Sequence, residues 1–93
     1  MANNNKYEQL KEQYMENLVQ FVPIVARVHG PHHPEFYDVQ KIFDVIVEDK
    51  VDLKESFNKL REITDNYTIP DDVCETYEYV YQALQQFDES YQV

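Results

Sequence analysis

Apolar residues recur every third or fourth position along almost the whole chain, and this spacing constrains the fold more than any other feature. Such spacing places the side chains on one face of an α-helix, which has about 3.6 residues per turn. The longest stretch covers residues 7–30, after a polar start at residues 1–5 that we expect to fray. Its predicted inward face is Tyr7, Leu10, Tyr14, Leu18, Phe21, Val22, Val25 and Val28.

Proline and glycine residues interrupt this first helix and end it. Pro23 lies inside the pattern and lacks a backbone N–H, so we expect a kink near it or a break just before it. Gly30 and Pro31 then end the segment, because glycine relieves the last turn and proline does not continue it.

Three more amphipathic segments follow. A second helix is predicted from Pro34, with the inward stripe Phe36, Val39, Ile42, Phe43, Ile46 and Val47. After an acidic link, Asp52 and Glu55 resemble a capping box, and the third helix ends near Asn66 with Leu53, Phe57, Leu60 and Ile63 inward. Residues 69–72 open the fourth, whose core face is Val73, Tyr77, Val80, Tyr81, Leu84, Phe87 and Tyr91. We therefore predict one all-α domain over residues 1–93, a small up-down four-helix bundle.

The charge of the chain limits its partners. Eight Lys and Arg residues stand against 18 Asp and Glu residues, which gives a formal net charge of −10. Such a surface repels phosphate backbones and anionic lipids, so we expect neither nucleic acid nor a membrane as a partner. No apolar run approaches the roughly 20 residues of a spanning helix, and the N-terminus lacks an apolar signal core. We expect a cytoplasmic protein whose partner is a protein with a basic surface, or bound cations.

The histidines are gathered in one short segment. His29, His32 and His33 lie within five residues, and Glu35 follows in the first turn of the predicted second helix. Imidazole and carboxylate groups together suit iron, zinc or manganese, so these four residues are the candidate metal ligands. Alternatively, the segment is only a stiff turn, in which proline and glycine set the geometry and the histidines cap carbonyl groups.

The same segment resembles a known family. Val25-Ala26-Arg27-Val28-His29-Gly30, followed by His32-His33-Pro34-Glu35, is similar to the inter-helix stretch of hemerythrin-like iron–sulfur cluster repair proteins. These are di-iron four-helix bundles linked to nitrosative and oxidative stress. The resemblance makes His32 or His33 the ligand match and Glu35 a motif match. It covers about a dozen residues well, and the first two helices loosely.

The chain also departs from that family. A di-iron centre needs several further histidines paired with carboxylates, and no histidine follows His33. The resemblance therefore implies a shortened relative that has lost the metal chemistry and has no cofactor. The alternative is a symmetric homodimer in which two copies of the histidine and Glu35 cluster share iron or zinc.

The remaining candidates are a thiol and two tyrosines. Cys74 is the only cysteine, so no internal disulfide forms, and we expect it to be packed and inert in the first turn of the fourth helix. Tyr37 and Tyr79 fall off the predicted core faces and are candidates for a partner or dimer surface.

With no catalytic constellation, we interpret the chain as a non-enzymatic protein-interaction domain. A metal-binding protein and an acidic interaction module unrelated to that family are the alternatives.

Overall fold

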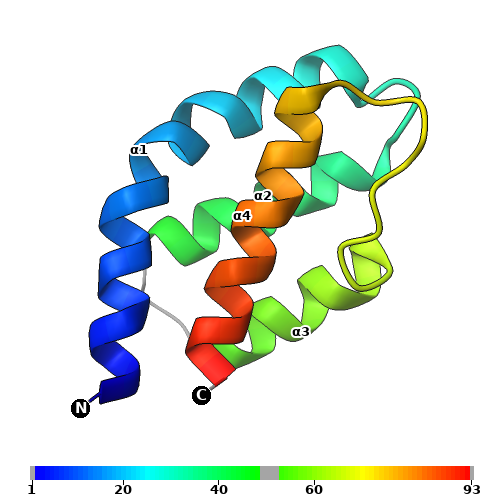
Figure 1. The fold of residues 1–93 in the computed structure, drawn as a ribbon. Helices are drawn as coiled ribbons and strands as arrows, with labels where there is room; N and C mark the ends of the chain where they lie inside the picture. Colours follow the sequence, from blue (N-terminus) through cyan, green and yellow to red (C-terminus); the bar gives the residue numbers. More distant parts are fainter. Residues whose placement is uncertain (1, 49–52, 93) are drawn as a thin grey trace.

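The computed structural model describes residues 2–48 and 53–92, and these residues form four helices. They are α1 (Ala2–His29), α2 (Glu35–Glu48), α3 (Leu53–Thr64) and α4 (Glu75–Gln92). Successive helices reverse direction, α1 packs mainly on α4, and α2 packs mainly on α3 (Figure 1). The start of α1 and the end of α4 therefore lie at the same end of the molecule (Figure 1). The all-α four-helix bundle predicted from apolar spacing is confirmed.

Helix α1 differs from the prediction at its start, and it is continuous at Pro23, where we predicted a kink or a break. The helix begins at Ala2, so the expected frayed start is wrong for residues 2–5; Met1 lies outside the described residues. The helix runs through Pro23 without a break and changes direction along its length (Figure 1). A proline inside a helix removes one hydrogen bond, and the neighbouring turns are enough to keep the helix continuous when one face is packed.

The core is built from one face of each helix. Its fully buried members include Leu18, Val22, Val25, Phe36, Val39, Phe57, Leu60, Tyr77, Val80, Tyr81 and Leu84. Three predicted core residues lie outside it, because Val28 is 57% exposed, Val47 is 39% exposed and Tyr91 is 36% exposed. All three lie near the end of a helix, at the margin of its packed stripe. The predicted Asp52 capping box lies outside the described residues.

The link between α3 and α4 is longer than expected. Helix α3 ends at Thr64, and Asp65, Asn66 and Tyr67 then take positive φ angles of 53°, 59° and 61°. Non-glycine residues rarely adopt this left-handed conformation, so the turn needs support from its surroundings. The Thr64 hydroxyl accepts the N–H of Tyr67 at 2.9 Å, and the N–H of Asn66 bonds to the Arg61 carbonyl at 2.8 Å. Helix α4 starts only at Glu75, which corrects the prediction that residues 69–72 open this helix.

A buried carboxylate joins the same turn to α4. Asp88 is 2% exposed, and its two oxygens accept hydrogen bonds from Arg61 Nη1 at 2.6 Å and from the Tyr67 hydroxyl at 2.9 Å. Burial, together with the negative charge of Asp88, raises the pKa of Tyr67 above its ordinary value. The Tyr67 hydroxyl therefore stays protonated and donates to Asp88.

Candidate functional site

The end of α1 and the starts of α2 and α4 meet at one end of the bundle, which we call the histidine end because His29, His32 and His33 lie there. Pro31 and Gly30 make the chain reverse after α1. The N–H groups of His32 and His33 both bond to the His29 carbonyl, at 3.0 and 2.8 Å, and close this turn. The stiff turn expected from the Gly and Pro residues is thus present, and it holds the histidines between two helices.

Gly30 is required by close packing. A Cβ atom at this position would collide with the Ala26 carbonyl oxygen and with the ring end of Tyr37. The residue is buried, and Tyr37 covers it from α2 while 44% of the tyrosine remains exposed. Tyr37 is therefore a surface residue, as predicted, but its ring also closes the turn between α1 and α2.

His33 lies between two carboxylates from different parts of the chain. Its Nδ1 atom is 3.2 Å from Glu35 Oε2, and its Nε2 atom is 3.0 Å from Asp72 Oδ1. Only an imidazolium ring has N–H groups on both nitrogens, so the charged form satisfies both carboxylates. The His33 side chain is 14% exposed, and its ring also meets the edge of Tyr77 at a centroid distance of 5.7 Å.

This arrangement brings together His33 and Glu35, two of the predicted metal ligands, but does not point them at one ion. The imidazole ring stands between Glu35 and Asp72, with each of its nitrogens occupied by one carboxylate. His32 is exposed to solvent. Within residues 2–48 and 53–92, no three His, Cys, Asp or Glu side chains are arranged to hold a metal ion.

His29 makes a contact that the sequence did not reveal. Its Nε2 atom lies 3.2 Å from the Sγ atom of Cys74, 45 residues away. Its ring also meets Tyr77 edge-on at a centroid distance of 5.3 Å, which holds the imidazole in place. Cys74 directly precedes α4 and is exposed, so the expectation that it is packed inside the first turn is wrong. The structure thus pairs the only thiol with an imidazole.

Aromatic rings fill the interior next to these histidines. Phe36 stacks on Tyr81 with ring centroids 6.1 Å apart, and the Tyr77 hydroxyl donates to the Tyr81 hydroxyl at 3.0 Å. Burial raises the pKa of both tyrosines, so their hydroxyls stay neutral. A di-iron centre needs charged or imidazole ligands from several helices, and among the described residues α3 and α4 contribute no histidine. The residues here do not fit such a centre within one chain.

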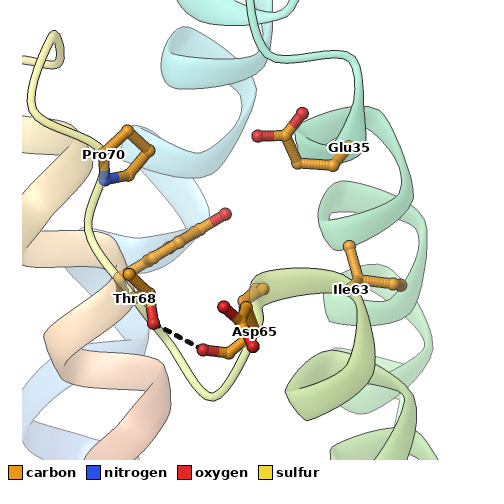
Figure 2. A pocket seen from close by; sticks show the side chains of 7 residues that line it. Glu35, Ile63, Asp65, Thr68 and Pro70 are labelled. Atoms are coloured by element: carbon orange, nitrogen blue, oxygen red, sulfur yellow. Dashed lines mark hydrogen bonds between the residues drawn. The ribbon is translucent and has the colours of Figure 1, made fainter.

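A cavity opens beside this interior, between α2 and the link that follows α3 (Figure 2). Its volume is about 260 Å³. Figure 2 shows the Glu35 carboxylate reaching in from α2, with Asp65, Thr68 and Pro70 on the facing wall. Glu35 therefore has two neighbours, His33 on one side and this cavity on the other.

Tyr79, the second predicted interaction residue, lies inside the α1–α4 contact instead of on a free surface. Its ring meets Tyr14 and Phe21 at centroid distances of 6.1 and 5.7 Å, and the Asn17 amide donates to its hydroxyl at 3.2 Å. The prediction placed Tyr79 off the main stripe of α4 correctly, but α1 crosses α4 widely enough to cover it. Tyr79 is therefore half-buried and stabilises the helix pair.

The comparisons with known proteins support a distant relation of this chain to a hemerythrin-like repair protein. The chain is 25% identical over 120 residues to the iron-sulfur cluster repair protein ScdA of Staphylococcus epidermidis, in strains RP62A and ATCC 12228. The match covers 88% of this chain and 53% of the relative, so the chain spans about half the length of these curated proteins. No family model matches the chain, and no solved structure matches it. Among the described residues, no helix has the length and apolar character needed to cross a membrane.

Proposed function

We propose that this chain is a shortened, metal-free relative of the hemerythrin-like repair proteins, which contributes to iron–sulfur cluster repair through protein contacts. One observation carries the proposal: three of the four candidate metal ligands, His29, His33 and Glu35, are already hydrogen-bonded to other side chains. His33 is paired with Glu35 and Asp72, and His29 is paired with Cys74. The domain is non-enzymatic in this proposal, and its helices serve to present a surface.

The alignment supports the idea of a shortened relative. It extends over 120 residues but includes only 88% of this 93-residue chain, so within the aligned region the repair protein has residues that this chain lacks. In this proposal, the further ligands of a metal site would belong to those additional residues. The remaining helices close their core with the rings of Phe36, Tyr77 and Tyr81.

The outer face of α1 supports a role in protein contacts. Ile24 is 44% exposed and Val28 is 57% exposed, and residues four apart on a helix are neighbours on its surface. Exposed apolar groups that lie together on a soluble domain are typical of interaction sites. Because the net charge is −10, a partner with a basic rim around an apolar centre would suit this surface.

Metal analysis is the first test. We expect the untagged protein, purified from cells supplied with iron and zinc, to be folded and to contain far less than one metal ion per chain by mass spectrometry. The variant His33→Ala and the control His32→Ala, at an exposed position, should both leave this result unchanged. Stoichiometric metal that is lost in His33→Ala would contradict the proposal and favour the alternative of a metal site shared by two chains.

Repair in cells is the second test. Cells that lack the protein should regain the activity of an iron–sulfur enzyme more slowly after exposure to nitric oxide. The double variant Ile24→Glu, Val28→Glu should fail to restore recovery, because it places two charges on the proposed contact face. Gln13→Glu, Gln20→Glu adds the same charge at exposed positions of α1 and serves as the matched control. Equal recovery with and without the protein would remove the link to repair.

A further inference from the structure

We propose that the cavity between α2 and the α3–α4 link (Figure 2) receives an arginine side chain of the partner protein. This inference rests on the proposed function, because it specifies the chemistry of one contact with that partner. The cavity is separate from the apolar face of α1. In this proposal, the α1 face makes the apolar contact and the cavity selects a charged group of the partner.

The cavity has the size and walls of a pocket for one side chain. Its volume of about 260 Å³ is below the roughly 300–1,000 Å³ that is typical of sites for drug-sized ligands. Its walls come from three separate parts of the chain, and its lining consists of Glu35, Ile63, Thr64, Asp65, Thr68, Pro70 and Tyr81. The left-handed turn at residues 65–67 fixes the outer wall, where the Thr68 hydroxyl donates to the Asp65 carbonyl at 2.6 Å (Figure 2).

The charge of the lining selects a cation. Glu35 and Asp65 contribute two carboxylates, and no lysine or arginine is part of the lining. The carboxylate of Asp65 makes no ion pair within the described part of the chain, and that of Glu35 meets only His33. Since the whole chain has a net charge of −10, its field also concentrates cations near this opening.

Tyr81 adds a buried acceptor to the wall. The residue is 1% exposed, and its hydroxyl oxygen accepts one hydrogen bond, from Tyr77. A hydroxyl oxygen has two lone pairs, and within the described residues no donor reaches the second one. An incoming N–H group could bond to this second lone pair, whereas an apolar side chain would add no hydrogen bond here.

Arginine fits this lining better than lysine does. The acceptors come from three separate parts of the chain, on Glu35, Asp65 and Tyr81. A guanidinium group has five N–H donors spread around a plane, so it can reach more than one of them. A lysine ammonium has three donors at one point and is more strongly hydrated. The flat guanidinium also pairs with a carboxylate through two parallel hydrogen bonds, which an ammonium group does not form.

Nuclear magnetic resonance with capped tripeptides tests this inference. We would titrate isotope-labelled protein with Gly-Arg-Gly, Gly-Lys-Gly and Gly-citrulline-Gly, whose citrulline has the shape of arginine without its charge. We expect saturable shifts of the backbone amides around residues 35 and 63–68 with the arginine peptide, weaker binding of the lysine peptide and none of the citrulline peptide. Glu35→Gln and Asp65→Asn should each weaken binding about three- to fivefold, as for a partly exposed charge pair. Asparagine also tolerates the positive φ at position 65.

Matched controls separate the possible outcomes. Glu12→Gln removes an equal charge from the exposed face of α1 and should change the affinity less than about twofold. An equal loss in Glu12→Gln and Glu35→Gln, equal binding of citrulline, or no shifts near the cavity would overturn the inference. If the Ile24→Glu, Val28→Glu variant fails in cells while Glu35→Gln restores recovery fully, the contact function stands and the arginine pocket is wrong.

Discussion

Arg61 Nη1 lies 2.6 Å from Asp88 Oδ1, and this ion pair joins the last turn of α3 to the last turns of α4. The second oxygen of Asp88 accepts the hydroxyl of Tyr67, so a single buried carboxylate also holds the left-handed turn. The Asp88 side chain thus bonds to both α3 and the left-handed turn from its place on α4.

Removal of this carboxylate should destabilise the protein strongly. We expect Asp88→Asn to lower the free energy of unfolding by about 2–3 kcal/mol, because it leaves a partly buried guanidinium without its counter-charge. Urea unfolding followed by circular dichroism would measure the loss. Glu55→Gln breaks the exposed Lys59–Glu55 pair and is the control, with an expected loss below about 0.5 kcal/mol. Equal losses in the two variants would show that the buried pair has no special role.

Gly30 provides a prediction about packing. Gly30→Ala should lower the free energy of unfolding by about 1–3 kcal/mol, because the new methyl group meets the Ala26 carbonyl and the Tyr37 ring. Adding Tyr37→Ala to this variant should recover part of the loss, since it removes one of the two obstacles. Thermal unfolding of both variants and of Tyr37→Ala alone forms a double-mutant cycle. Strictly additive effects would contradict a contact between residues 30 and 37.

The buried tyrosines predict how stability depends on alkaline pH. Burial raises the pKa of Tyr67, Tyr77 and Tyr81 above the ordinary value of 10.0, so the folded state holds these protons more tightly than the unfolded state. Their contribution to stability is full below the unfolded pKa and is lost as the pH rises through the folded pKa. We expect tyrosinate absorbance from these residues to develop only together with unfolding. Tyr67→Phe should have a shallower loss of stability above about pH 10. Reversible ionisation of all eight tyrosines while the helices persist would contradict this expectation.

The contact between His29 and Cys74 predicts a reactive thiol. An exposed thiol beside an imidazole loses its proton to that ring as it attacks a disulfide reagent, and the thiolate is the reactive form. We expect His29→Gln to slow the reaction of Cys74 with a neutral aromatic disulfide about three- to tenfold. His32→Gln, which changes an exposed histidine, is the matched control. In denaturant, both variants should react at the same rate as the original protein. Similar rates for all three proteins in the folded state would contradict a role of His29 in the reactivity of Cys74.

Features that depend on residues close together in the sequence were predictable, and contacts between residues far apart in the sequence were not. The stripes of α2 and α3 were predictable because residues such as Phe36, Val39 and Phe43 repeat at helical spacing within one element. The pairing of His33 with Asp72 and of His29 with Cys74 joins residues 39 and 45 positions apart. Such contacts depend on how α1 and α4 cross, which apolar spacing does not specify.

The start of α4 shows a second limit. Pro70 and the two acidic residues after it look like the opening of a helix, since acidic residues favour the first turn. The left-handed turn before them sends the chain along the bundle first, and Asp72 is used to bind His33 instead of a helix end. Asp65 and Asn66 tolerate positive φ better than most residues do, but no local pattern indicates that Tyr67 continues the left-handed turn.

The start of α1 and the end of α4 lie at the same end of the bundle, away from the histidine end (Figure 1). An affinity tag, a fused reporter or a chip surface joined to either terminus would therefore leave the thiol–imidazole pair facing solution. Binding and reactivity measured on immobilised protein should match the values for free protein. The same geometry allows the start of α1 and the end of α4 of one copy to be joined by a short flexible linker, as in a circularly permuted protein.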